Sequence, residues 1–342
     1  MGQPVELAFA GAGWIAAVHG YAVEHVADLS ITNVASRDPA RAAEAARRLG
    51  AGACTYADLP AGADGVVVCT PPAQHADHVL SSSAGGAAVL VEKPLCTTLA
   101  DADRLVQAAE GGARIAYAEN LLHAPAVRMA IDHASQIGAI DVLEVRALQS
   151  RPTWGDFLTT GWGGGVLFDL GVHPLSVALL LAGTARPAAV RCVREGADDH
   201  PVDEHADRVL RFDSGLEARV VTSWREAGTP TWDAQAASAS GVVRLELLPE
   251  VRVERDGDDL ELPKAPDGVV PQLYELGYLD QLSTFADDVR ADRAPALGAA
   301  FGRDVLDVVC GAYQSAGQDG GWVALPFEGP RDRTPLELWR HP

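Results

Sequence analysis

Two stretches of this sequence carry side chains suited to proton transfer or to stabilising a developing charge. The first holds Lys93, which follows the apolar run 88–91 and is one of only two lysines in the chain. A lysine at such a strand end could donate a hydrogen bond to a substrate oxygen and stabilise negative charge on it. The alternative is a solvated surface lysine, which the scarcity of lysine elsewhere ranks second.

The second stretch holds Asp169 and His173 in the apolar segment 166–181, which the pattern predicts as one long helix. Because they are four residues apart, the two side chains would share one helix face. A carboxylate beside an imidazole makes a proton acceptor that can be tuned near neutral pH. The alternative is an aspartate that interacts with the helix dipole and a histidine packed in a core. The two residues alone favour neither interpretation.

The N-terminal elements indicate where a cofactor would bind. An apolar run over 6–10 predicts a strand, and it leads into Gly11-Ala-Gly13-Trp14-Ile15-Ala16 and a helix extending to about residue 25. This is the G-x-G-x-x-A form of the dinucleotide fingerprint. Its first glycine permits a tight turn, its second lets the backbone approach a pyrophosphate, and its small third residue lets helix pack on strand. The alternative is a glycine-rich turn without a ligand.

Regular alternation of elements supports the cofactor interpretation. Strands are predicted at 31–35, 65–69, 88–91 and 114–117, and helices at 40–49, 73–80 and 98–110. This order predicts an α/β fold with a doubly wound parallel sheet, the Rossmann arrangement. Ligands of such folds bind beyond the C-terminal ends of the strands, which is where Lys93 lies.

The tip of the second strand bears on the choice of dinucleotide. An acidic residue there would bind the ribose 2′-hydroxyl of NAD, whereas an arginine accommodates the 2′-phosphate of NADP. This chain has Ser36 and Arg37, with Asp38 displaced to the start of the next helix. The sequence therefore favours NADP. If Arg37 only stacks on the adenine, NAD binds as well.

The C-terminal part is predicted as an α+β domain with a mainly antiparallel sheet. Its predicted strands cover 143–149, 188–193, 207–212, 216–224, 242–247 and 251–255, and its predicted helices cover 273–291 and 302–316. Asp213-Ser-Gly215 supplies the turn of a hairpin between two of these strands. We expect residues 1–120 to form the dinucleotide-binding domain and residues 121–342 the substrate domain.

Further polar and aromatic residues are candidates for contacts with the substrate. Trp154 and Trp162 precede the Asp169 segment and could stack on a sugar face, or could simply cover their own loop. Glu119, Asn120 and Arg151 are candidates for contacts with substrate hydroxyls. The His- and Asp-rich stretch 198–205 lacks a helical metal-ligand spacing, so a solvated acidic loop is favoured and no metal site is expected.

Composition narrows the class of protein. A net charge of −20 disfavours nucleic acid and anionic membranes as partners, because their phosphates would be repelled. Five widely spaced cysteines suggest buried reduced thiols instead of a disulfide framework. The N-terminus has no signal-peptide pattern and no apolar run is long enough for a bilayer. A cytoplasmic protein is therefore expected.

Taken together, the motifs resemble those of the Gfo/Idh/MocA oxidoreductase family, the group of glucose–fructose oxidoreductase and inositol dehydrogenase. The resemblance runs nearly from end to end. It includes the Gly11 turn, Thr70-Pro71-Pro72 with His75, Glu92-Lys93-Pro94, and Gly164-Gly165 followed by Asp169 and His173. Two departures, Glu119-Asn120 in place of an arginine-rich stretch and Pro174 after His173, bear on substrate identity.

The resemblance implies hydride transfer between a nicotinamide cofactor and a hydroxyl or keto carbon of a sugar, glycoside or cyclic polyol. In that scheme Lys93 polarises the oxygen, His173 is the general acid or base, and Asp169 orients the substrate or the pair. Thr70, Pro71, His75 and Glu92 would adjoin the cofactor. A homodimer or homotetramer is also implied. The alternatives are a redox-neutral glycosidase that retains its cofactor and a non-catalytic sensor.

Overall fold

The computed structural model describes residues 4–59, 61–197 and 199–341, and the chain divides into two compact units. Unit 1 comprises residues 1–96, 100–120 and 265–303, and unit 2 comprises residues 97–99, 121–264 and 304–342. The expected change after residue 120 coincides with a change of unit. Residues 265–303, which the sequence predicts to lie in the second domain, instead pack within unit 1.

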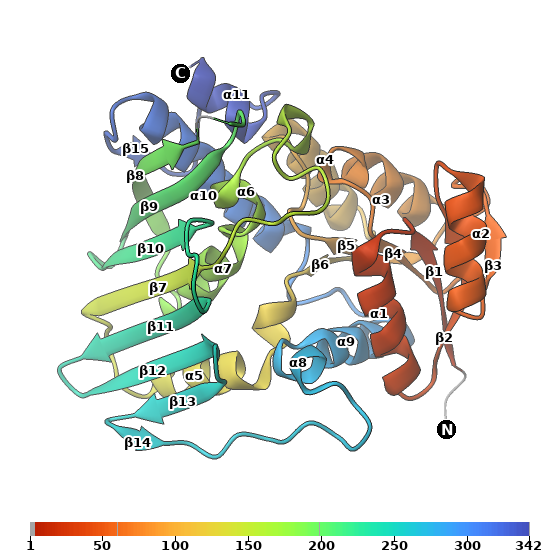
Figure 1. Cartoon of the computed structure of the whole chain (residues 1–342), viewed down its shortest axis with the longest axis horizontal. Helices are drawn as coiled ribbons and strands as arrows, with labels where there is room; N and C mark the ends of the chain where they lie inside the picture. The colour runs from red at the N-terminus through yellow and green to blue at the C-terminus, as the bar shows by residue number, and fades with distance from the viewer. Residues whose placement is uncertain (1–3, 60, 198, 342) are drawn as a thin grey trace. The chain divides into compact units, whose positions relative to one another are not determined.

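Unit 1 is built on a six-stranded parallel sheet with the order β3-β2-β1-β4-β5-β6 (Figure 1). Its strands are β1 (Val5–Ala10), β2 (Leu29–Ala35), β3 (Gly52–Cys54), β4 (Gly65–Val68), β5 (Ala88–Glu92) and β6 (Ile115–Ala118). Its helices are α1 (Trp14–His25), α2 (Pro39–Arg48), α3 (His75–Ala84), α4 (Leu99–Glu110), α8 (Pro271–Glu275) and α9 (Tyr278–Arg290). The predicted doubly wound sheet is confirmed. Strand β3 was not predicted, because three largely exposed residues carry no apolar run.

The core of unit 1 explains why α9 belongs to it. Strands β4 and β5 are buried at every position, as expected for parallel strands covered on both faces. Leu282 and Phe285 of α9 lie in the same apolar cluster as Leu7 and Phe9 of β1. The late segment 265–303 therefore completes the core of the first unit, and the predicted boundary at 120 describes only part of the division.

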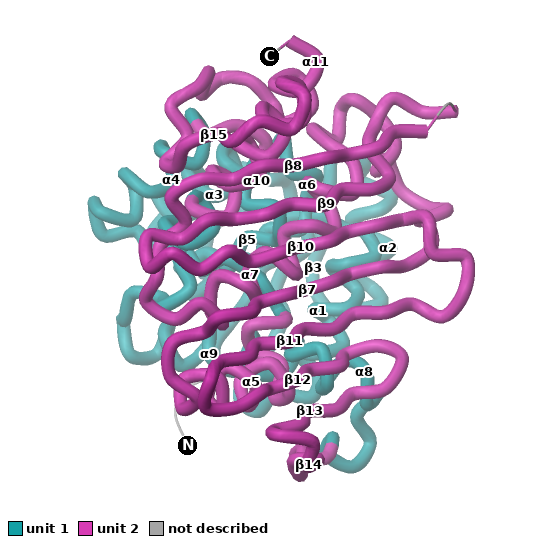
Figure 2. The backbone as a smooth tube through the Cα atoms, turned by 90° about the vertical axis from the view of Figure 1, so that its left-hand side faces the viewer, with its two compact units in different colours: residues 1–96, 100–120, 265–303 teal, residues 97–99, 121–264, 304–342 magenta. Residues whose placement is uncertain are grey.

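Unit 2 contains a nine-stranded sheet with the order β14-β13-β12-β11-β7-β10-β9-β8-β15, in which β7 and β10 are parallel and the other neighbours antiparallel. Figure 2 shows these strands side by side. They are β7 (Val142–Leu148), β8 (Pro187–Gly196), β9 (Asp203–Phe212), β10 (Glu217–Ser223), β11 (Thr231–Ser238), β12 (Gly241–Leu248), β13 (Arg252–Arg255), β14 (Asp258–Asp259) and β15 (Val323–Ala324). The predicted mainly antiparallel sheet is confirmed, with β11 as a strand that the sequence pattern did not reveal.

One face of this sheet is covered by helices. The helices of unit 2 are α5 (Pro125–Ser135), α6 (Val166–Asp169), α7 (Val172–Leu181), α10 (Ala299–Gly317, whose first turn lies in unit 1) and α11 (Pro335–Arg340). Strand β7 alternates, with Leu143, Val145 and Ala147 buried and the residues between them partly exposed. This period of two places α7 on one face of β7 and charged side chains on the other.

The structure also bears on the cysteines and on the possibility of a membrane-spanning helix. All five cysteines lie in the described residues, where none forms a disulfide and four are buried. In the described part of the chain no single helix is both long and apolar enough to cross a membrane. The bent pair of segments 160–169 and 172–181 reaches that length and composition only when the two are taken together.

Candidate active site

The segment that carries Asp169 and His173 is not one continuous helix. It divides into α6 and α7, and the segments on either side of the break, 160–169 and 172–181, meet at 42°. Proline at 174 has no N–H to donate to the carbonyl of Leu170, and its ring would crowd that carbonyl in an unbroken helix. The Leu170 oxygen instead accepts from the N–H of His173 at 3.1 Å. The predicted helix over 166–181 was therefore wrong in its continuity, and Pro174 is the cause.

Glycines hold this segment in place by close packing. A Cβ at Gly165 would lie 2.3 Å from the carbonyl oxygen of Asp203, and one at Gly171 would lie 2.3 Å from the carbonyl oxygen of Leu167. Gly163 has φ +104°, a conformation that other residues rarely adopt. The glycine-rich sequence thus lets the backbone pass tightly over β9 and turn at the break.

Asp169 and His173 are both largely buried, with 9% and 7% of their surface exposed. The indole of Trp232 on β11 lies 5.7 Å from the imidazole of His173, centroid to centroid. Its Nε1 is buried without a hydrogen-bond partner in the described residues. Sequence reasoning missed Trp232, because β11 itself was not predicted. The indole of Trp232 therefore limits the access of water to one side of the imidazole of His173.

The two glycines of the dinucleotide fingerprint, both in unit 1, differ in backbone conformation and in the space around them. Gly11 has φ +120°, and a Cβ there would lie 2.6 Å from the carbonyl oxygen of Cys69. Gly13 is the N-cap of α1, and a Cβ there would meet nothing within 4 Å. Trp14 begins the helix and is 61% exposed, followed by the partly buried Ile15. The open space at Gly13, at a helix N-terminus, suits a pyrophosphate.

The end of β2 presents the residues that bear on dinucleotide choice. Ser36 is half-buried and Arg37 is exposed. Asp38 caps α2, since its Oδ1 accepts from the N–H of Ala40 at 2.9 Å, so its carboxylate is committed to the helix. Arg41 and Arg48 of α2 line a groove of about 280 Å³ that also includes Gly13 and Trp14. These two arginines were not singled out from the sequence.

The loops after β4 and β5 are tied together by His75. Its Nε2 lies 2.7 Å from the carbonyl oxygen of Thr70, and its Nδ1 lies 2.9 Å from that of Pro94. Burial lowers the pKa of His75, and the facing carbonyls oppose this shift. Because both ring nitrogens face main-chain oxygens, His75 links the two loops. Pro71, at the start of the loop, precedes a short 3-10 turn.

Lys93 follows the buried carboxylate of Glu92. One oxygen of Glu92 lies 2.7 Å from Nε2 of His19, and the other accepts from the N–H of Lys93 at 3.0 Å. Both oxygens are thus engaged within the protein, which makes Glu92 an anchor for the strand end. Lys93 itself is half-buried, and its peptide bond to Pro94 is cis.

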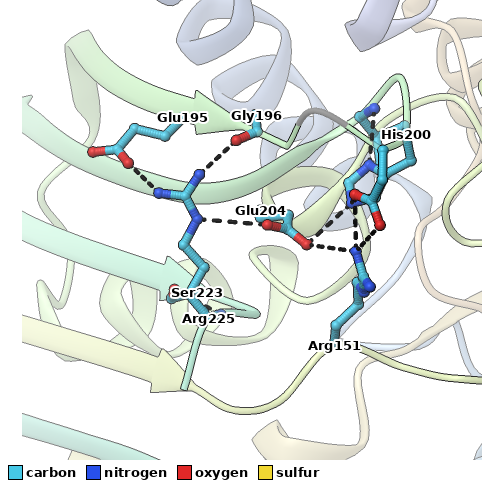
Figure 3. Close-up of polar contacts among 9 residues, drawn as sticks. Arg151, Glu195, Gly196, His200, Glu204, Ser223 and Arg225 are labelled. Carbon is cyan, nitrogen blue, oxygen red and sulfur yellow. Dashed lines mark hydrogen bonds and ion pairs between the residues drawn. The ribbon is translucent and has the colours of Figure 1, made fainter. Parts of the chain in front are cut away.

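The remaining polar candidates occupy varied surroundings. Glu119 is fully buried, and the side-chain amide of Asn120 donates to the carbonyl of Leu276 at 2.8 Å. Arg151 donates to Asp199 at 3.0 Å and to Glu204 at 3.1 Å (Figure 3). These guanidinium and amide groups already have acceptors, so a substrate would have to share or displace them.

The acidic stretch after residue 198 differs from the solvated loop that we expected. Asp203 is fully buried, and Glu204 binds His200 as well as two arginines, Arg151 and Arg225 (Figure 3). The error arose because a run of charged residues was interpreted as a solvent-facing loop, whereas β9 begins within this run, at Asp203. No cluster of metal-binding side chains occurs in the described residues.

The aromatic residues of the β7–α6 connection pack on one another. Phe157 lies edge-on to Trp154 at 4.8 Å and to Trp162 at 4.6 Å. Trp154 nevertheless keeps 53% of its surface exposed. The cluster covers its own loop and still presents the indole of Trp154 to solvent.

Comparisons with known proteins agree with this architecture. Residues 5–119 match the profile of an oxidoreductase family with an NAD-binding Rossmann fold, and residues 126–241 match the GFO/IDH/MocA C-terminal domain. The chain belongs to the Gfo/Idh/MocA family. It is accordingly an oxidoreductase of the NAD(P)-binding type, as the sequence predicted.

Similar members of the Gfo/Idh/MocA family act on sugars and polyols by name. The chain is 30% identical to D-xylose 1-dehydrogenase (NADP(+)) 2 of Haloferax volcanii, over 85% of this chain and 91% of that protein. It is 27% identical to inositol 2-dehydrogenase of Rhizobium meliloti, over the same shares. Among solved structures, levoglucosan dehydrogenase with NADH matches with a TM-score of 0.85 at 20% identity, over 95% of this chain and all of that chain (100%). That likeness supports the fold.

Proposed function

We propose that this protein is an NADP-dependent dehydrogenase or ketoreductase of a sugar, glycoside or cyclic polyol. The observation that carries the proposal is the pair Asp169 and His173, largely buried on either side of a helix break that close-packed glycines maintain. A binding protein would have no need of a proton-transfer pair held in this way. The similarity to xylose and inositol dehydrogenases supports a polyhydroxylated substrate.

Each of the three polar residues has a distinct role in the proposal. A bound nicotinamide supplies or accepts the hydride. His173 removes the hydroxyl proton during oxidation as the general base and returns it during reduction as the general acid. Lys93 donates a hydrogen bond to the substrate oxygen and stabilises the charge that develops there. Asp169 binds a substrate hydroxyl or orients the imidazole.

Three features of unit 1 fit a dinucleotide. The space at Gly13 is open to a pyrophosphate at the N-terminus of α1. The hydroxyl of Thr70 is buried without a hydrogen-bond partner in the described residues, so it is available to a nucleotide. Arg37, exposed at the end of β2, supports NADP over NAD, and Arg41 on the adjoining helix adds a second guanidinium.

The test is a screen of NADP and NAD against aldoses, keto-sugars, glycosides and cyclic polyols, with product analysis. We expect net formation or consumption of NADPH with at least one polyhydroxylated compound. Cleavage of a glycoside with no net change in NADPH would instead identify a redox-neutral glycosidase. Tight binding of a sugar without any turnover would identify a sensor.

We also propose a homodimer or homotetramer that uses the open face of the nine-stranded sheet. This face carries ion pairs such as Arg146–Asp233 at 2.5 Å and Arg219–Asp207 at 2.7 Å. Alternating charges of both signs can pair with a second copy related by a twofold axis. Sedimentation analysis should show an oligomer that Arg219→Glu weakens. A monomer at every protein and salt concentration would contradict this assembly.

A further inference from the structure

Strand β9 contributes a buried arginine that lies behind the break between α6 and α7. Arg208 is 0% exposed, and its guanidinium donates to three neutral oxygens. These are the carbonyl of Gly171 at 3.1 Å, the hydroxyl of Thr222 at 2.6 Å and the carbonyl of Val220 at 3.4 Å. Within the described residues it forms no ion pair. Burial lowers its pKa to about 10, so the side chain remains a cation at neutral pH.

Burying a cation without a carboxylate partner costs free energy of folding, so we expect such an arginine to have a structural role. The bond to Gly171 offers one. The Gly171 carbonyl also accepts from the N–H of Leu175 at 3.3 Å, which makes it the first acceptor of α7. Arg208 therefore binds the carbonyl at which α7 begins, two residues before His173 and two residues after Asp169.

The same strand also holds the other end of this segment. The carboxylate of Asp203 accepts from the N–H of Gly165 at 3.2 Å and from the N–H of Leu167 at 2.9 Å, and it binds the hydroxyl of Tyr313 at 2.5 Å. A register shift between β8 and β9 near this point lets Asp203 lie on the buried face together with Arg208. The carboxylate of Asp203 thus binds N–H groups at the start of α6, and the guanidinium of Arg208 binds the carbonyl of Gly171 between α6 and α7.

We propose that Arg208 is a positioning residue for the Asp169–His173 pair and acts through the carbonyl of Gly171. This inference rests on the proposed function, because it takes those two residues as the proton-transfer pair. Arg208 does not touch the substrate. It sets the orientation and position of α7, which carries His173. A displacement of about 1 Å at a reacting group can cost on the order of 100-fold in rate.

The test compares Arg208→Met, Arg208→Lys and a matched control, Leu210→Ala. Leu210 is fully buried two residues further along the same strand, so its truncation lowers stability without touching Gly171. We expect Arg208→Met to lower kcat about 10- to 100-fold with an unchanged Kd for NADP, and Arg208→Lys to recover part of kcat. Leu210→Ala should lower Tm and keep kcat within about twofold.

A double-mutant cycle with His173→Ala separates positioning from general destabilisation. If Arg208 acts through the pair, Arg208→Met should have no further effect on kcat in the His173→Ala background. Equal kcat in Leu210→Ala and Arg208→Met would overturn the proposal. If the methionine variant does not fold, Arg208→Lys takes its place, and a kcat equal to that of Leu210→Ala would then overturn the proposal. Full activity of His173→Ala would instead refute the proposed function, and with it the positioning role.

Discussion

Nε2 of His19 lies 2.7 Å from a carboxylate oxygen of Glu92, and both side chains are buried. His19 is in the helix that follows the dinucleotide turn, and Glu92 ends the strand that leads to Lys93. The pair therefore connects the helix at the predicted cofactor site to the residue that we propose polarises the substrate.

Removal of Glu92 should affect both stability and turnover. Glu92→Ala leaves the imidazole of His19 and the N–H of Lys93 without their acceptor, which costs about 1–3 kcal/mol per buried group. We expect a lower Tm and a reduced kcat. Glu110→Ala, which removes an exposed carboxylate on α4, is the control and should change neither. An unchanged kcat in Glu92→Ala would show that the position of Lys93 does not depend on this anchor.

The two fingerprint glycines should respond differently to alanine. At Gly13 a Cβ has room in the protein but enters the space assigned to the pyrophosphate, so Gly13→Ala should fold normally and lose at least about tenfold in NADP affinity. At Gly11 the same change meets the carbonyl of Cys69, so Gly11→Ala should also lower Tm. Thermal melts and fluorescence titrations measure both quantities. Undiminished NADP binding by Gly13→Ala would place the cofactor elsewhere.

The preference for NADP should reside in Arg37. Arg37→Ala removes a guanidinium from the end of β2, so the Kd for NADP should rise far more than the Kd for NAD. Arg47→Ala is the matched control, because Arg47 is exposed on α2 and does not line the groove beside Gly13. Equal losses of NADP and NAD affinity in Arg37→Ala would contradict the preference.

His123 should make the protein sensitive to acid. Burial lowers its pKa from 6.5 to about 4 in the folded state, with Arg128 adding to the shift. The unfolded chain then binds more protons, so the free energy of unfolding falls as pH drops from about 6.5 towards about 4, by about 1–3 kcal/mol. Denaturant titrations should show a smaller loss in His123→Gln. The same pH dependence in both proteins would rule out His123 as its source.

The sequence predicted the Rossmann unit well because its signals are local. Apolar runs such as 65–68 are continuous, and the turn at Gly11 has few alternatives. Long-range packing was harder to foresee. Nothing near Phe285 indicates that α9 completes the core around Phe9, and nothing near Trp232 indicates that it lies beside His173. The break at Gly171 could have been foreseen from Pro174, which cannot lie in the middle of an unbroken helix.

The central claim, that Lys93 and His173 carry out the chemistry, is tested most directly by single-turnover kinetics on enzyme preloaded with NADP. We predict that Lys93→Met and His173→Ala each slow formation of NADPH by about 10²- to 10⁴-fold while the Kd for NADP changes little. Lys264→Met, which alters the only other lysine at an exposed position, should match the unmodified enzyme. Turnover within a few-fold of the unmodified enzyme in either active-site variant would contradict the account.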